Sequence, residues 1–126
     1  MPKTVPVLPS APGAMGPYSV ATEANGFVFI SGQVAVDPIS SERSPDDVEI
    51  QAGKVMTNIT AILGDLGLGL SDIAKTTIFL ADIADFPKVN EVYAGFFEDE
   101  PPARSTVQAG ALPGGFLVEI EVIAAR

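Results

Sequence analysis

The stretch SPDDVEIQAGKVMTNITAILGDLG, residues 44–67, decides the fold because it carries the full pattern of an amphipathic helix. Ser44 is of a type that caps helices, Pro45 suits the first helical position, and Asp47 stands where a capping box places its acid. Gly67 is of the type that ends a helix. Between these signals, apolar residues recur in steps of four and three, which is one helical face: Val48, Ala52, Val55, Ile59, Ile62 and Leu66. The pattern predicts a helix of about 22 residues, about 33 Å long.

Runs typical of β-strands lie on both sides of this helix. Residues 27–36 are rich in β-formers, and Gly32 inside that run indicates a bulge or a close backbone approach. Three later segments also predict strands: residues 75–81, 104–108 and 118–124. The Pro-rich segment 1–17 is predicted to be an irregular arm laid over the fold.

A second helix is predicted to begin at Asp85, and its apolar face comprises Phe86, Val89, Tyr93 and Phe96. Strands interleaved with two long amphipathic helices predict an α+β fold with both helices on one face of the sheet. At 126 residues the chain is expected to form one domain, residues 1–126, with enough buried surface for a real core.

Composition and charge exclude several classes of function. Sixteen acidic residues outnumber seven basic ones, so the net charge of −9 argues against nucleic acid and anionic membranes as partners. The first fifteen residues lack the pattern of a signal peptide, and no apolar run is long enough to span a bilayer. We therefore expect a cytoplasmic protein. The hydrophobic fraction of 47% exceeds what a solvated monomer needs, so some apolar surface is expected to face another subunit.

The chain contains no cysteine and no histidine. Disulfides, thiolate nucleophiles, cysteine-ligated zinc and Ser-His-Asp catalysis are thereby excluded, as are nearly all transition-metal sites. A carboxylate site for magnesium is chemically open, but no acidic cluster has suitable spacing, so no metal is expected. An Arg/Glu pair on sheet strands is the best remaining candidate for catalysis or ligand binding.

Arg104 and the pair Glu119/Glu121 are the candidates of that kind. Arg104 could grip a substrate carboxylate with its guanidinium fork or form an ordinary surface salt bridge, and spacing leaves the two about even. The period of two places both glutamates on one face of a strand. They could be solvent-facing decoration, which the residues alone favour, or one could be a base with a raised pKa.

Three weaker candidates have similar alternatives. Tyr18 follows a Gly-Pro pair and could contact a substrate through its hydroxyl or plug the core with its ring. Ser31 and Gly32 could offer a hydroxyl and backbone donors to a ligand or could form a strand bulge. Asn90 on the second helix could contact a ligand, although a surface position is the more common reading.

Taken together, these segments resemble the RidA/YjgF family of reactive-intermediate deaminases. The resemblance covers nearly the whole chain in the expected order, and the stretch 102–120 is its most specific part. The matching segments are Gly16-Pro17-Tyr18-Ser19, Ser31-Gly32-Gln33, Asn58-Ile59, residues 89–93, Phe96-Phe97, Pro102-Ala103-Arg104-Ser105, Leu112-Pro113 and Val118-Glu119-Ile120-Glu121.

The resemblance implies a chorismate-mutase-like fold with a mixed sheet, assembled as a homotrimer with a ligand cleft at each subunit interface. It implies hydrolysis of 2-imino acids, such as 2-iminobutanoate and 2-iminopropanoate, to 2-keto acids and ammonia without a cofactor. The preferred imino acid stays open. A non-catalytic trimer that binds small 2-keto acids in a regulatory role is the alternative.

The family pattern also implies roles for individual residues. Arg104 would bind the substrate carboxylate beside backbone donors near Thr106, and Glu119 would take a proton from water. The remaining lining of the cleft would come from Tyr18, Ser31, Gly32 and Asn90. Many family members carry cysteine at the position of Thr106, so threonine here preserves a backbone contact but excludes thiol chemistry.

Overall fold

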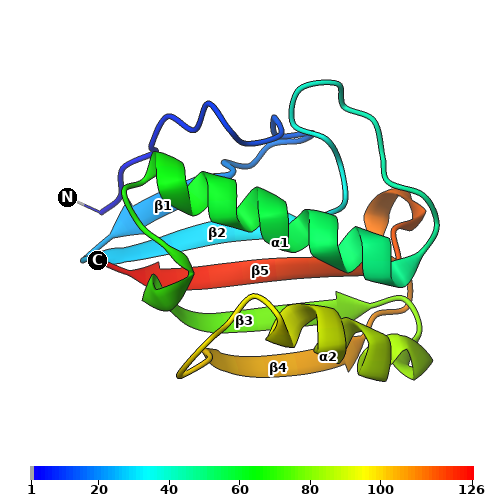
Figure 1. Cartoon of the computed structure of the whole chain (residues 1–126). Helices are drawn as coiled ribbons and strands as arrows, with labels where there is room; N and C mark the ends of the chain where they lie inside the picture. The colour runs from blue at the N-terminus through cyan, green and yellow to red at the C-terminus, as the bar shows by residue number, and fades with distance from the viewer. Residues whose placement is uncertain (1) are drawn as a thin grey trace.

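The computed structural model describes residues 2–126 and shows one five-stranded sheet with two helices on the same face (Figure 1). The strand order is β1-β2-β5-β3-β4. Strand β5 is antiparallel to both of its neighbours, whereas β3 and β4 are parallel, so the sheet is mixed. The predicted α+β class is confirmed. The strands are β1 (Ala21–Ala24), β2 (Phe27–Gln33), β3 (Ile73–Leu80), β4 (Ala103–Gln108) and β5 (Val118–Ala125).

Helix α1 (Val48–Asp65) has 18 residues, fewer than the sequence predicts. Its N-cap is Asp47, whose carboxylate accepts hydrogen bonds from the backbone N–H groups of Glu49 and Ile50. The prediction that Ser44 caps the helix is wrong: the Ser44 N–H instead donates to the carbonyl of Ala35, which ties it to the preceding loop. Gly67 follows the helix with a φ of +72°, as its proposed C′ role requires.

Two other elements differ from prediction. Helix α2 (Phe86–Ala94) has only nine residues, so the expectation of two long helices is wrong for the second. Strand β2 ends at Gln33, and residues 34–36 form only an isolated bridge, between Val36 and Arg43. Its register against β5 shifts between Ile30 and Gln33, which places a bulge at Ser31-Gly32 as the glycine indicates. The short strand β1 has no counterpart among the predicted elements.

The core lies between α1, α2 and the sheet. Along β5, Val118, Ile120, Val122 and Ala124 are buried and Glu119 and Glu121 alternate with them, so both glutamates share the face that carries no helix. That face also carries large exposed apolar side chains: Phe27 is 45%, Phe29 42% and Val107 45% exposed. A sheet face this apolar is a candidate surface for association.

Candidate active site

Glu119 lies against the bulge of β2. A β-carbon built on Gly32 would stand 2.8 Å from the carboxyl carbon of Glu119 and would overlap its Oε2 atom. A side chain at position 32 would therefore displace this carboxylate from its place beside the β2 backbone. The sequence indicated a close approach at Gly32, and the group that approaches is the Glu119 side chain.

The surroundings of Glu119 raise the pKa of its carboxyl group. Burial is the larger cause because it disfavours the charged form, and the negative charge of Glu121 adds to it. A carboxylate with a raised pKa is a better proton acceptor than an ordinary glutamate, as a general base requires.

A cavity of about 620 Å³ opens beside this carboxylate. Its lining includes four predicted site residues, Tyr18, Ser31, Gly32 and Glu119, which the structure therefore brings together. Tyr18 is 51% exposed, and its hydroxyl accepts a hydrogen bond from the Met15 N–H at 3.3 Å. The Ser31 hydroxyl donates to the carbonyl of Ser19 at 2.7 Å, an interaction that ties β2 to the N-terminal arm.

Arg104 lies elsewhere, near the start of the edge strand β4. Its guanidinium carbon is 5.1 Å from the ring centroid of Tyr93 and 5.5 Å from that of Phe86, both on α2. Within residues 2–126 the ion pairs join Lys54 to Asp37 and Arg126 to Glu23, and Arg104 takes part in neither. The salt-bridge alternative for Arg104 thus has no support within one chain.

Arg104 and Asn90 line a second cavity, of about 390 Å³, at the end of α2. Its other walls are mainly apolar and include Tyr93, Phe97 and Pro102, and the acidic Glu98 also lines it. A guanidinium at the wall of a cavity can form a bidentate interaction with a carboxylate.

Thr106 lies on β4, two residues after Arg104. Its hydroxyl is buried without a hydrogen-bond partner among the described residues, and its side chain lines neither of these two cavities. Because β4 is an edge strand, the backbone groups on its outer side have no strand partner and are free to bind a ligand or another chain.

The two halves of the predicted site lie on opposite faces of the sheet. Arg104 pairs in register with Thr76, which is fully buried beneath the helices and in turn pairs with Val122 of the core. Glu119 pairs with Phe79 on the helix-free face. A single chain therefore does not place Arg104 and Glu119 in one cavity.

Residues that the sequence did not single out also line the Glu119 cavity, namely Met15, Val34 and Phe116. Met15 directly precedes the Gly-Pro-Tyr segment of the arm, which is the signal that could have included it. Phe116 follows the turn Pro113–Gly115 and could have been suspected from its position just before β5.

Within residues 2–126, no three acidic residues gather in a way that could hold a metal ion. No helix in the same range is long and apolar enough to cross a bilayer.

Comparison with known proteins shows which family the chain belongs to. Residues 8–126 match the model of a family described as Endoribonuclease L-PSP. The protein named 2-iminobutanoate/2-iminopropanoate deaminase from Mus musculus is 43% identical over 116 residues, which are 92% of this chain and 86% of the mouse protein. The chain belongs to the RidA/YjgF family.

Two further relatives show that proteins of the RidA/YjgF family carry different names. Protein DfrA from Myxococcus xanthus is 49% identical over 116 residues, 90% of this chain and 88% of that protein. The crystal structure of E. coli TdcF with bound serine has a TM-score of 0.91 at 41% identity and covers 98% of both chains. The five-stranded fold is therefore that of RidA/YjgF structures.

Proposed function

We propose that the protein hydrolyses 2-imino acids to 2-keto acids and ammonia. The observation that carries the proposal is the half-buried carboxylate of Glu119, with its raised pKa, at the wall of a cavity that also includes Tyr18 and Gly32. The name of the mouse relative supports the same reaction class. The two compounds in that name, 2-iminobutanoate and 2-iminopropanoate, are the first to test.

The protein has only to position a water molecule and remove its proton, because the carbon of a protonated C=N bond is already electrophilic. Glu119 takes a proton from a water molecule while the water oxygen forms a bond to that carbon. Glu119 then gives its proton to the carbinolamine nitrogen, the C–N bond breaks to release ammonia, and the hydroxyl loses its proton to solvent and becomes the carbonyl of the 2-keto acid. Arg104 binds the substrate carboxylate and holds the carbon near the water.

We further propose that each complete site lies between two subunits, with Arg104 from one and Glu119 from its neighbour. The placement of these side chains on opposite sheet faces supports this arrangement, since one chain cannot bring them together. The exposed Phe27, Phe29 and Val107 supply an apolar surface on which a second copy could pack. A homotrimer is the assembly that we propose.

A coupled assay tests the activity. A dehydratase acting on threonine or serine generates the imine, semicarbazide traps what remains, and the wild-type protein should lower the amount trapped. Arg104→Ala and Glu119→Gln should each reduce this effect about 100-fold or more. Lys88→Ala, which removes an exposed cation from α2, serves as the matched control and should behave as wild type. Equal activity of Arg104→Ala and wild type would refute the proposed site.

A non-catalytic binder of small carboxylates is the second candidate, and the serine bound in the TdcF structure favours considering it. Glu119→Gln separates the two functions. A binder should retain its affinity for a 2-keto acid, measured by calorimetry, and wild type should leave imine trapping unchanged. An enzyme should lose turnover when the base is removed.

The family description also names an endoribonuclease. The net charge of −9 and the absence of histidine weigh against RNA cleavage in this chain. Tight RNA binding in a salt titration would contradict this expectation.

A further inference from the structure

The guanidinium of Arg104 lies against two aromatic rings of α2, the helix that lies over β3 and β4 (Figure 1). These rings belong to Phe86 and Tyr93, which stand about two turns apart on one face of the helix. Their centroids, at 5.5 and 5.1 Å from the guanidinium carbon, are within the distance at which the negative face of a ring attracts a cation. We call Phe86 and Tyr93 the aromatic bracket.

Tyr93 is itself fixed by the strand beside Arg104. Its hydroxyl oxygen and Oγ1 of Thr76 are hydrogen-bonded at 2.8 Å, and both residues are buried. Burial raises the pKa of the Tyr93 phenol, so the hydroxyl stays neutral at physiological pH. Thr76 pairs in register with Arg104 across β3 and β4. Strand pairing, hydrogen bond and ring contact therefore join Arg104, Thr76 and Tyr93 into one closed unit.

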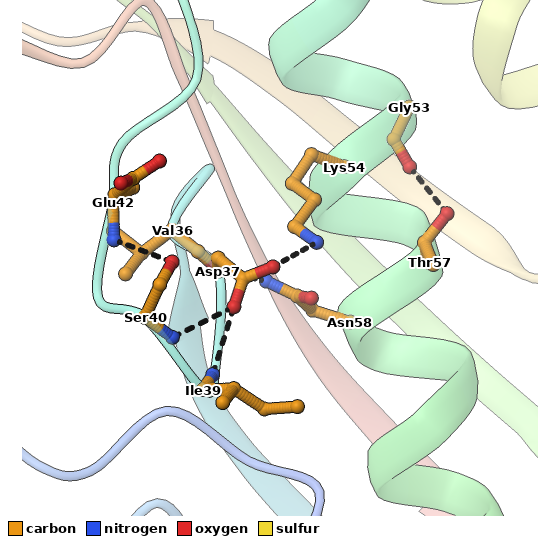
Figure 2. A network of polar contacts seen from close by, with 9 residues as sticks. All are labelled: Val36, Asp37, Ile39, Ser40, Glu42, Gly53, Lys54, Thr57 and Asn58. Carbon is orange, nitrogen blue, oxygen red and sulfur yellow. Dashed lines mark hydrogen bonds and ion pairs between the residues drawn. The ribbon is translucent and has the colours of Figure 1, made fainter.

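The aromatic bracket holds Arg104 without neutralising it. A carboxylate partner would also hold the side chain, but it would compete with an anionic ligand. Lys54 illustrates that arrangement, because its Nζ lies 3.4 Å from Oδ2 of Asp37 (Figure 2). Glu98 lines the same cavity as Arg104, but the ion pairs within residues 2–126 include neither of them. Because an aromatic ring attracts a cation without carrying a net charge, the charge of Arg104 stays available for an anion.

We propose that Phe86 and Tyr93 are positioning residues that hold Arg104 ready for the substrate carboxylate, and that Thr76 keeps the Tyr93 ring in the required place. The inference rests on the proposed function and adds residues that act through Arg104. An arginine already held in its binding conformation loses less side-chain freedom when the carboxylate binds. The aromatic bracket should therefore act on the affinity for the substrate, and so on KM more than on kcat.

A double-mutant cycle tests whether the rings act through Arg104. Tyr93→Leu and Phe86→Leu each replace a ring by an aliphatic side chain, alone and in the Arg104→Ala background. The kcat and KM for 2-iminobutanoate, generated by a threonine dehydratase, are measured with the semicarbazide trap, at raised protein concentration where activity is low. Phe96→Leu is the matched control, because this partly buried residue just after α2 undergoes the same exchange and does not line the Arg104 cavity.

Tyr93→Leu should lower kcat/KM about tenfold and Phe86→Leu about threefold, mainly through KM, because each removes a ring that attracts the guanidinium. Phe96→Leu should stay within about twofold of wild type. In the Arg104→Ala background, either ring replacement should change kcat/KM less than about twofold, because the group that the rings position is gone.

The role of Thr76 is tested separately. Tyr93→Phe keeps the ring and removes its hydroxyl, and Thr76→Val keeps the shape of Thr76 and removes the other hydroxyl. Each should raise KM about threefold, and the two together should raise it no further, because either change alone breaks the same hydrogen bond. An unchanged KM in both single variants would overturn the role of Thr76.

Equal losses from a ring replacement with and without Arg104 would show that the rings only support the fold, and would overturn the inference while leaving the deaminase proposal standing. A wild-type kcat/KM for both ring variants would overturn it too. Phe86→Leu decides the question if Tyr93→Leu does not fold. Wild type inactive on the imine would overturn the proposed function, and the same cycle, measured by calorimetry as the Kd for 2-ketobutyrate, would then decide the role of the aromatic bracket.

Discussion

At the scale of single residues, Gly32 and Glu119 depend on each other. The missing side chain at position 32 is the space in which the Glu119 carboxylate lies, and the same contact keeps that carboxylate partly out of water. Both residues could be singled out from the sequence, but the sequence alone does not show that they are in contact. Their contact depends on the bulge in β2 and on its register against β5.

Gly32→Ala tests this dependence. The added methyl group would displace the carboxylate, and a displacement of about 1 Å in a catalytic group costs about 100-fold in turnover, so kcat should fall by that order. Gly64→Ala is the control: its β-carbon would meet nothing within 4 Å, and it should leave kcat unchanged while raising stability by about 0.5–1 kcal/mol. A wild-type kcat for Gly32→Ala would show that the position of Glu119 does not matter.

The pH dependence provides a second prediction. Because the pKa of Glu119 is raised, its basic form is lost at a higher pH than for an ordinary glutamate, so activity should fall on acidification earlier than the usual value predicts. Glu121→Gln removes the second cause of the shift and should move the acidic limb of the kcat profile to lower pH. An acidic limb that stays in place would contradict the role of Glu121.

The same shift has a consequence for stability. In the pH range between the unfolded and folded pKa values of Glu119, the folded protein binds more protons than the unfolded chain, so stability falls as pH rises through that range. Glu119→Gln removes this penalty and should unfold at a urea midpoint equal to or above that of wild type at pH 7, while turnover is lost. A lower midpoint would mean that the charged form is stabilised by contacts in the folded protein.

At the scale of elements, the periodic patterns in the sequence located both helices and every strand except β1, whereas the sequence did not predict where each element begins and ends. The four-three spacing located α1, and the alternation of β5 placed Glu119 and Glu121 on one face. Ser44 and Asp47 are both good caps, and only the path of the preceding loop decides between them. Strand β1 was missed because Ala21–Ala24 contains few β-formers and is held by pairing with β2.

The start of α1 can be tested directly. Asp47→Ala removes the acceptor for two backbone N–H groups and should cost about 1 kcal/mol of unfolding free energy, measured by urea denaturation. Ser44→Ala should cost less than about 0.5 kcal/mol because the serine contributes through its backbone. The reverse ranking would restore Ser44 as the cap.

At the scale of the whole molecule, the fold separates the two halves of the candidate site. Arg104 and Glu119 could be proposed as site residues only through the family resemblance, because the residues alone left Arg104 undecided and favoured solvent-facing glutamates. Their separation could not, because it follows from the pairing of Arg104 with Thr76 on one sheet face and of Glu119 with Phe79 on the other. If Arg104 and Glu119 act on one substrate, a neighbouring subunit must therefore complete the proposed site.

Complementation between two inactive variants tests this requirement most directly. Arg104→Ala and Glu119→Gln chains are unfolded, mixed in equal amounts and refolded together, and imine hydrolysis is measured after mixed oligomers have been verified by mass spectrometry. If each site takes Arg104 from one subunit and Glu119 from its neighbour, random mixing should restore about a quarter of wild-type activity, because that fraction of sites receives both intact residues. Mixed oligomers no more active than the parent variants would contradict the account.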